Sequence, residues 1–283
     1  MIYLSQHEID QIILEDTPLH DETSRALGLS QQRGIIEIRA REAGIVCGLR
    51  IAEKMATSLN LSFETALEDG DAISAGLQIL SAQGSAQNLH IFWKQALNVI
   101  EYLSGVAGYT QRMVTQAREI QPTIQVATTR KALPSARKLL QYAVLCGGGI
   151  IHRTGLSETL LVFEQHRAFF PELSLQDFVQ CLRQHSPEKR VMLEAETAQQ
   201  AIEAAQAGAD QLQLDKFSAD QLRELVPQLK HHSPGLVIAA TGGVRLETAA
   251  AYAQTGVDIL ITSSPYHAKP ADFGAKITAL STR

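Results

Sequence analysis

One pattern occurs twice in the second half of this 283-residue chain and constrains its fold more than any other feature. In 199–215 (QQAIEAAQAGADQLQLD) and 249–262 (AAAYAQTGVDILIT), a helical stretch is followed by glycine, by Ala-Asp or Val-Asp, and by a short apolar strand. Glycine at this position commonly ends a helix. A repeated unit in which a helix leads directly into a strand predicts parallel strands joined by helices.

Short apolar segments with strand character recur at regular intervals from about residue 122 onward. They are 123–128, 159–163, 190–196, 211–215, 236–241 and 258–262. Their close spacing favours a β/α barrel over an open doubly wound sheet. Six strands are identifiable, so the sequence does not support a complete eight-stranded barrel.

The first hundred residues have a different pattern. Residues 34–42 alternate like a strand, 49–60 look helical, and 68–84 contain short apolar alternation broken by Asp-Gly and Gly. Residues 88–104 and 107–120 are expected to form two long helices. We therefore expect an N-terminal α/β sandwich domain (1–108), a barrel domain (109–268), and a C-terminal segment (269–283) that packs back on the first domain.

Composition excludes several classes of protein. The formal charge of -5 and the pI near 6.0 argue against nucleic acid as the main partner. No apolar run approaches the ~20 residues that a membrane span needs. The first 17 residues carry carboxylates where a signal peptide would carry lysines, so we expect a cytoplasmic protein. Its three cysteines are far apart and form neither a metal motif nor a disulfide framework.

A cationic run interrupts this acidic chain between Thr128 and Arg153. It contains five Lys or Arg residues and one histidine but no Asp or Glu, and Gly147–Gly149 lie within it; the charged residues are Arg130, Lys131, Arg137, Lys138, His152 and Arg153. Such a run predicts a place that holds anions. For Arg137 and Lys138 alone, a solvated helix face is the simpler interpretation.

Polar residues follow the candidate strands where each one ends. They are Thr128 to Arg130, Glu164, Glu194 with Glu196, Asp215, Thr241 to Gly243, and Thr262 to Ser264. Because barrel chemistry lies at the carboxyl ends of the strands, these groups should meet at one opening. Asp215 could instead cap the following helix, a role for which Ser218 competes. Gly242 and Gly243 could form no more than a turn.

This set of groups suits reaction at a phosphorylated sugar. Backbone N–H groups at Gly242 and Gly243, with the Ser263 hydroxyl, could bind a 5-phosphate, and His267 could add a donor. Carboxylates accept hydrogen bonds from ribose hydroxyls and, with phosphates, bind Mg²⁺. A carboxylate also stabilises the positive charge that develops when the anomeric carbon is displaced.

Four ordered segments resemble the quinolinate phosphoribosyltransferase (nicotinate-nucleotide pyrophosphorylase) family. They are 96–110 (ALNVIEYLSGVAGYT), TTRK…CGGG…HRTGLS within 128–157, 194–217, and 240–260. The likeness covers nearly the whole chain and is closest to the ModD-type paralogues that are encoded with molybdate transport genes. It implies an incomplete barrel of about seven strands and a pentosyltransferase that uses phosphoribosyl diphosphate and Mg²⁺.

The resemblance also implies a role for each matching residue. Arg130, His152 and Arg153 would hold the acceptor's carboxylates, and Lys131 would lie between acceptor and diphosphate. Glu194 and Asp215 would engage ribose hydroxyls and the metal, while Gly242, Gly243, Ser263 and His267 would surround the 5-phosphate. The family's shared site further implies a homodimer or higher homo-oligomer acting on small molecules.

Three departures from the family pattern bear on the substrate. Phe163 stands where the family usually has a lysine, Lys94 replaces an arginine contributed across the dimer interface, and Ser263 replaces a glycine. Loss of a cation beside a carboxylate is costly, so a dicarboxylate should fit less well. The sequence therefore predicts a phosphoribosyltransferase with an altered nitrogen-heterocycle acceptor, and the resemblance to ModD-type proteins implies a link to molybdenum transport or metabolism.

Two alternatives stay open. One is a true quinolinate phosphoribosyltransferase of NAD biosynthesis, which would decarboxylate its product; Phe163 and Lys94 speak against it. The other is a non-catalytic sensor of an anion or nucleotide. Glu194 and Asp215 weigh against that interpretation, because an anion sensor has no use for carboxylates.

Overall fold

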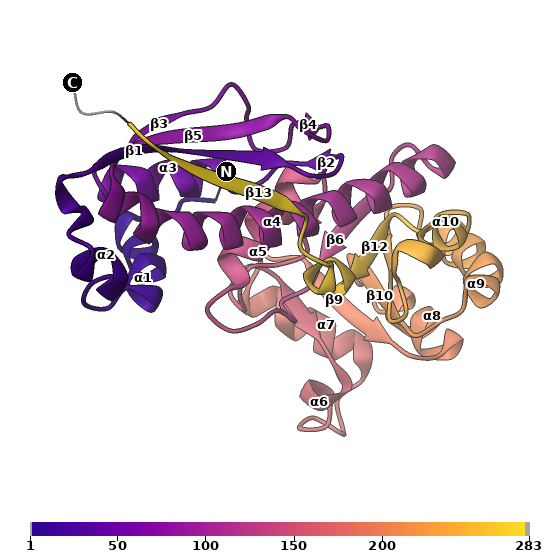
Figure 1. Ribbon diagram of the computed structural model, residues 1–283. Helices are drawn as coiled ribbons and strands as arrows, with labels where there is room; N and C mark the ends of the chain where they lie inside the picture. The colour runs from indigo at the N-terminus through magenta and orange to yellow at the C-terminus, as the bar shows by residue number, and fades with distance from the viewer. Residues whose placement is uncertain (1, 281–283) are drawn as a thin grey trace. The chain divides into compact units, whose positions relative to one another are not determined.

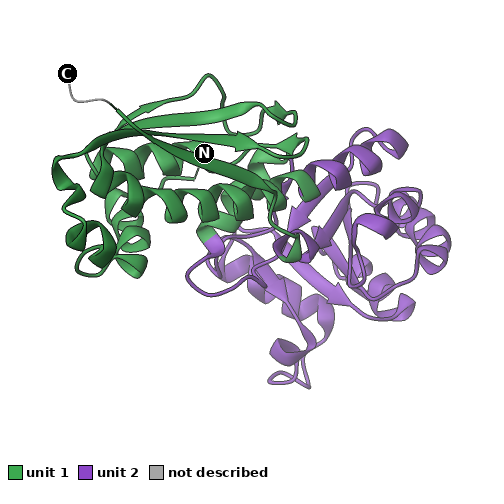
Figure 2. Cartoon of the chain, viewed as in Figure 1, with its two compact units in different colours: residues 1–109, 138–147, 267–283 green, residues 110–137, 148–266 purple. Residues whose placement is uncertain are grey.

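The computed structural model describes residues 2–280 and divides into two compact units (Figures 1 and 2). Unit 1 contains the chain up to residue 109, the segment 138–147 and the chain from residue 267. Unit 2 contains 110–137 and 148–266. The segment 138–147, within the range expected for the barrel domain, therefore clusters with unit 1.

Unit 1 is built on a four-stranded antiparallel sheet of order β13-β1-β5-β3. Strand β1 (Arg33–Ala40) pairs with β5 (Gln78–Ser85) on one side and with β13 (Phe273–Ala279) on the other. Strand β3 (Ser62–Glu64) extends the sheet beyond β5. The last described strand of the chain thus lies beside the first.

The apolar residues of β1 alternate, and Ile36, Ile38 and Ala40 are buried. Helix α3 (Leu49–Ser58) also has five buried residues, Leu49, Ile51, Ala52, Met55 and Ala56. The remaining elements of unit 1 are α1 (Gln6–Asp16), α2 (Glu22–Ala26), η1 (Leu29–Gln31), the pair β2 (Gly44–Ile45) and β4 (Ala72–Ile73), α3 (Leu49–Ser58) and most of α5 (Arg137–Cys146).

A single helix, α4 (Ala86–Ile120, 35 residues), replaces the two helices expected at 88–104 and 107–120. Gly105 lies within this helix, and a Cβ there would lie 2.2 Å from the carbonyl oxygen of Lys269. The glycine admits a neighbouring backbone segment and does not end the helix.

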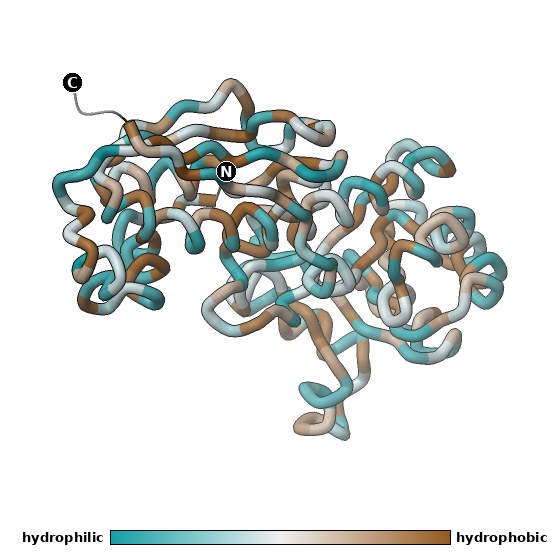
Figure 3. Tube along the Cα trace, viewed as in Figure 1, coloured by the Kyte–Doolittle hydropathy of each residue, from teal (hydrophilic) through white to brown (hydrophobic). Residues whose placement is uncertain are grey.

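Unit 2 contains a seven-stranded sheet of order β7-β6-β12-β11-β10-β9-β8 in which every pairing is parallel. Its strands are β6 (Gln125–Thr128), β7 (Ile150–Ile151), β8 (Leu160–Val162), β9 (Val191–Ala195), β10 (Gln211–Asp215), β11 (Val237–Thr241) and β12 (Ile259–Thr262). Apolar strand segments are drawn brown in Figure 3. The expectation of an incomplete, seven-stranded barrel is confirmed, and β7 is the strand that the sequence pattern did not reveal.

The repeated helix–glycine–strand unit is also confirmed. Helix α8 (Ala198–Gln206) leads into β10, and α10 (Ala249–Ala253) leads into β12. Gly208 and Gly256 follow these helices with φ of 85° and 81°, the left-handed conformation that ends a helix. The other helices of unit 2 are α6 (Glu164–Arg167), α7 (Leu175–His185), α9 (Ala219–His232), η2 (Leu246–Thr248) and η3 (Ser264–His267), the last residue of which belongs to unit 1.

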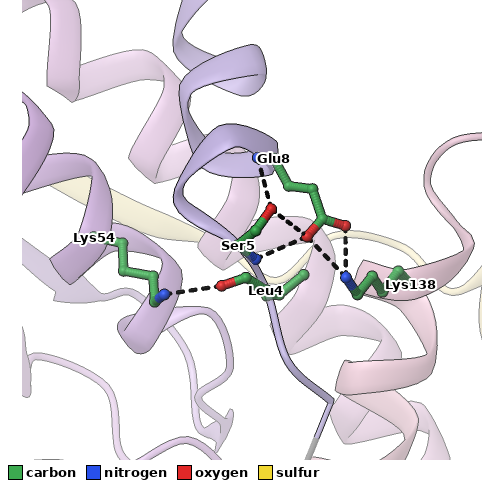
Figure 4. A network of polar contacts seen from close by, with 5 residues as sticks. All are labelled: Leu4, Ser5, Glu8, Lys54 and Lys138. Atoms are coloured by element: carbon green, nitrogen blue, oxygen red, sulfur yellow. Dashed lines mark hydrogen bonds and ion pairs between the residues drawn. The ribbon is translucent and has the colours of Figure 1, made fainter.

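Polar contacts tie the first helix to α5 within unit 1 (Figure 4). Ser5 and Glu8 form a reciprocal capping box at the start of α1. The Lys138 ammonium donates to both carboxylate oxygens of Glu8, at 2.6 and 2.8 Å, and Lys54 donates to the Leu4 carbonyl at 2.9 Å. Lys138 is therefore engaged by a carboxylate of the same unit, whereas the simpler interpretation from the sequence was a solvated helix face. Within the described part of the chain, no helix is long and apolar enough to cross a membrane.

Candidate active site

The carboxyl ends of the unit 2 strands line a cavity of about 340 Å³. Strand register explains which side chains meet there. Gln213 lies beside Glu194 on adjacent strands, and Asp215 lies beside Thr241. The lining residues are Thr129, Arg130, Lys131, His152, Arg153, Leu161, Phe163, Gln165, Glu194, Glu196, Gln213, Asp215, Lys216 and Thr241.

Seven of the sequence-predicted site residues meet in this cavity. They are Arg130, Lys131, His152, Arg153, Phe163, Glu194 and Asp215. The structure therefore places these seven residues around one cavity.

One side of the cavity is cationic. Arg153 is buried, and no carboxylate within residues 2–280 forms an ion pair with Arg130, Lys131 or Arg153. Burial, followed by repulsion from Arg130, lowers the pKa of Arg153. Guanidinium groups without protein counter-ions suit a planar anionic ligand, which they can bind through two parallel hydrogen bonds.

His152 lies on this cationic side. Its backbone N–H donates to the Thr128 carbonyl at 3.0 Å, so it continues the pairing of β7 with β6. Burial, and then the neighbouring Arg153, lower the pKa of His152 to about 4. The buried Nε2 atom has no hydrogen-bond partner among the described residues. A neutral imidazole with an unsatisfied nitrogen is suited to hydrogen-bond a ligand in the cavity.

Another part of the cavity lining is acidic. The Glu194 carboxylate accepts a hydrogen bond from Gln213 Nε2 at 2.5 Å. Burial raises the pKa of Glu194, and the nearby carboxylates of Asp215 and Glu196 raise it further. Asp215 does not cap α9, because the Ser218 side chain accepts from the Gln221 N–H at the start of that helix. Its carboxylate is therefore available to the cavity.

A lysine side chain lies beside two carboxylates of this cavity. Lys216 Nζ lies 3.2 Å from Asp215 Oδ2 and 4.0 Å from Glu196 Oε1. No group of three or more His, Cys, Asp or Glu side chains among the described residues is arranged to hold a metal ion. The described carboxylates therefore form no cage of three or more protein ligands, and Mg²⁺ commonly relies on one or two carboxylates together with substrate phosphates.

Phe163 is shared by this cavity and a second, more apolar one of about 860 Å³. Its ring stacks on His166 with centroids 5.7 Å apart, and its backbone N–H donates to His166 Nδ1. Arg130 and Arg153 also line both cavities. The larger cavity is otherwise lined mainly by apolar side chains: Leu156, Leu160, Leu161, Val162, Phe169, Phe170, Phe178 and Leu182.

The four residues expected at a 5-phosphate do not line the 340 Å³ cavity. Gly242 and Gly243 follow β11 with φ of 78° and 77°, and Ser263 follows the neighbouring strand β12. A Cβ at Gly242 would lie 2.8 Å from Asp215 Oδ1 and from the Lys216 backbone nitrogen. Gly242 is therefore required by both space and conformation, beyond any role in binding phosphate.

Two predicted site residues lie in unit 1. His267 is exposed at the end of η3, and Lys94 lies on α4 with its Nζ 4.9 Å from the centre of the Trp93 ring. Lys94 lines a separate cavity of about 510 Å³ together with residues of α1, α2 and the segment between them. Neither residue is among those that line the barrel cavity.

Sequence reasoning missed four lining residues, Leu161, Gln165, Gln213 and Lys216. Gln213 was identifiable, because residues two apart on a strand share a face and Asp215 was already a candidate. His166, which was not among the predicted site residues, stacks on the candidate residue Phe163. Tyr266 was not among the predicted site residues. Its hydroxyl lies 2.9 Å from both Thr128 Oγ1 and the Thr129 carbonyl, and so links the segment after β12 to the end of β6.

Comparison with known proteins covers both units. Residues 21–104 match the N-terminal domain of quinolinate phosphoribosyl transferase, and residues 106–276 match its C-terminal domain. The chain is 43% identical over 275 residues to a protein of Escherichia coli O6:H1 (strain CFT073) provisionally named pyrophosphorylase ModD; the match covers 96% of each chain.

Two further similarities reach the nicotinate-nucleotide pyrophosphorylases. A Methanothermobacter thermautotrophicus protein provisionally named nicotinate-nucleotide pyrophosphorylase (carboxylating) is 32% identical over 279 residues, covering 96% of this chain and 98% of the other. The crystal structure of NadC from Streptococcus pyogenes superposes with a TM-score of 0.88 at 27% identity, covering 99% and 100% of the two chains.

Proposed function

Because this chain belongs to the quinolinate phosphoribosyl transferase family and is an enzyme of the pentosyltransferase type, we propose that it carries out phosphoribosyl transfer to an acceptor other than quinolinate. The sugar donor is phosphoribosyl diphosphate, the acceptor is a nitrogen heterocycle, and pyrophosphate is released. The observation that carries the proposal is the position of Phe163, an aromatic side chain on the wall of the cavity that Arg130 and Arg153 also line.

The acceptor half of the cavity combines a cationic and an apolar surface. Arg130 and Arg153 supply two guanidinium groups, while Phe163 and Leu161 supply apolar surface. His152 is neutral above its pKa of about 4 and adds no charge at pH 7. This combination favours a flat heterocycle with less negative charge than a dicarboxylate, such as a purine-like or pterin-like ring or another aromatic acid.

The sugar half of the proposal assigns roles to the remaining lining residues. Glu194 and Asp215 accept hydrogen bonds from ribose hydroxyls, and their charge stabilises the oxocarbenium-like state at the anomeric carbon. Lys131 lies between acceptor and diphosphate and balances negative charge on the leaving group. The 5-phosphate is bound by Gly242, Gly243 and Ser263, at the ends of β11 and β12, with His267 as a further donor.

Mg²⁺ remains part of the proposal as an ion that enters with the diphosphate. It would neutralise charge on the leaving pyrophosphate, with phosphate oxygens as its main ligands.

We also propose a cytoplasmic homo-oligomer, at least a dimer, in which Lys94 of one subunit serves the site of another. The proposed link to molybdenum rests on the similarity to ModD proteins, and the genes that neighbour this one would test it.

The decisive experiment measures pyrophosphate release from phosphoribosyl diphosphate with Mg²⁺, adding quinolinate and a panel of heterocycles one at a time. We expect release with a heterocycle other than quinolinate. Faster release with quinolinate would contradict the altered acceptor and favour the role in NAD biosynthesis. If no acceptor supports pyrophosphate release and the sugar diphosphate still raises the thermal midpoint, a binding protein is favoured.

A substitution at Phe163 tests the acceptor pocket directly. Phe163→Lys restores a cation beside Arg130 and Arg153, so activity with quinolinate should rise on the order of tenfold or more, in line with the cost of an unpaired buried charge. Phe163→Leu is the matched control, because it removes the ring without adding charge. No gain for the lysine variant over the leucine variant would count against this assignment of the pocket.

A further inference from the structure

Lys216 has an unusual backbone conformation at the edge of the candidate site. It follows β10 directly and has φ of 61°, in the left-handed region that lysine seldom adopts. Its N–H donates to the Thr241 carbonyl at 2.8 Å, which fixes this conformation against the end of β11. The side chain lines the 340 Å³ cavity.

The ammonium of Lys216 bridges two acidic side chains. Nζ lies 3.2 Å from Asp215 Oδ2 and 4.0 Å from Glu196 Oε1. Gly242 leaves room for this arrangement, because a Cβ there would lie 2.9 Å from Lys216 Cγ. Backbone conformation, a neighbouring glycine and two carboxylates thus all contribute to placing one positive charge.

Stability does not account for this arrangement. The Lys216 side chain is 75% exposed, and ion pairs of exposed lysines contribute little to folding. The left-handed conformation is itself unfavourable for a lysine. A residue that is locally unfavourable and lines a candidate site is better explained by function.

We propose that Lys216 is a built-in cation that takes the place of a protein-held divalent metal ion at Asp215 and Glu196. This role rests on the proposed phosphoribosyl transfer, in which negative phosphates must enter a cavity lined by three carboxylates. The single positive charge of the ammonium lies beside two of those carboxylates and offsets one unit of their negative charge without a metal. Mg²⁺ then reaches the site only with the sugar diphosphate.

The test replaces Lys216 with asparagine, which lacks the charge and tolerates the left-handed conformation. Mn²⁺ is titrated into the purified chain without substrate, and its binding is followed by electron paramagnetic resonance. Wild type should show no specific site, because the Lys216 ammonium lies beside the carboxylates. Lys216→Asn should gain a specific Mn²⁺ site, on the order of tenfold tighter than the nonspecific binding of wild type, since Asp215 and Glu196 then lack their shared counter-ion.

Three controls isolate the effect. Lys189→Asn makes the same charge change at an exposed position of unit 2 and should leave Mn²⁺ binding as in wild type. Lys216→Arg should also behave like wild type, because it keeps the cation. Asp215→Asn in the Lys216→Asn background should abolish the new site. The thermal midpoint of each variant verifies folding.

The outcomes separate this inference from the proposed function. If Lys216→Asn binds Mn²⁺ no better than Lys189→Asn, or if wild type already has a site that Asp215→Asn removes, the inference is overturned even where turnover is observed. If the new Mn²⁺ site appears but no acceptor supports pyrophosphate release, the built-in cation stands and phosphoribosyl transfer fails.

Discussion

At the scale of single residues, His152 links folding stability to pH. Its pKa in the folded chain is about 4, against an ordinary value of 6.5. Between these values the unfolded chain binds a proton that the folded chain excludes. The stability that this pKa shift contributes is therefore fully present above pH 6.5 and is lost as the pH falls towards 4. The shift corresponds to at most about 3 kcal/mol.

Urea unfolding between pH 7.5 and 4 checks this prediction. As the pH is lowered, the free energy of unfolding of wild type should decrease more steeply than that of His152→Gln, which has no titrating ring. His231→Gln, at an exposed position on α9, should retain the wild-type slope. Equal slopes for wild type and His152→Gln would show that the imidazole is not held neutral.

Gly242 and Gly243 form a natural pair for separating backbone strain from steric contact. Their φ angles are nearly equal, 78° and 77°, so alanine is strained at either position. At Gly242 the added Cβ would lie 2.8 Å from Asp215 Oδ1, whereas at Gly243 its nearest neighbour, Tyr252 Oη, is 3.7 Å away. Each alanine should cost about 1–2 kcal/mol from strain.

Gly242→Ala should show a further loss, because the methyl group displaces Asp215. We expect an additional cost on the order of 1–3 kcal/mol in unfolding experiments. Its sugar-diphosphate affinity should also fall more than that of Gly243→Ala. Matching losses of both stability and affinity in the two variants would mean that the contact with Asp215 is unimportant.

At the scale of elements, Gly105 should reverse the usual effect of alanine in a helix. In a helix interior, Gly→Ala ordinarily stabilises by about 1 kcal/mol. Here the Cβ would lie 2.2 Å from the Lys269 carbonyl oxygen, so the helix or the segment at residue 269 must move. Gly105→Ala should therefore destabilise the chain by about 2 kcal/mol or more.

Thermal or urea unfolding of two α4 variants measures this effect. Gln111→Ala, at an exposed position of the same helix, controls for helix propensity and should change stability by less than about 0.5 kcal/mol. A stabilised Gly105→Ala would show that the Lys269 segment moves away without cost. It would also show that this glycine has no packing role.

The same glycine shows that local sequence patterns do not predict features that depend on contacts between distant residues. Local periodicity revealed six strands and the repeated helix–strand unit, because each depends on neighbouring residues. It missed β7, since two isoleucines are too few to show a period. It split α4 at Gly105, because the backbone that approaches this glycine lies more than 160 residues away in the sequence.

In the candidate site, too, residues placed by local pattern could be predicted, and a residue placed by tertiary contacts could not. Residues at strand ends, such as Glu194 and Asp215, could be predicted because parallel strands place their carboxyl ends together. Lys216 could not, because its left-handed φ arises from tertiary contacts with Thr241 and Gly242. A lysine in that conformation has no signature in a single sequence.

At the scale of the whole molecule, the proposed oligomer makes a prediction about shared sites. Lys94 belongs to unit 1, on α4, and does not line the barrel cavity of unit 2, whereas Asp215 does. If Lys94 of one subunit serves the barrel of another, Lys94→Ala and Asp215→Asn inactivate different halves of a composite site. Each variant alone should have little activity.

Mixing the two variants should then restore activity. In a two-fold symmetric dimer with random subunit exchange, half of the dimers are mixed, and each mixed dimer has one site with both native residues. A 1:1 mixture should therefore recover roughly a quarter of the wild-type rate. The Glu194→Gln and Asp215→Asn pair is the control, because both changes lie in the same barrel and should not complement. If Lys94→Ala and Asp215→Asn fail to complement although light scattering shows mixed dimers, Lys94 does not act across subunits.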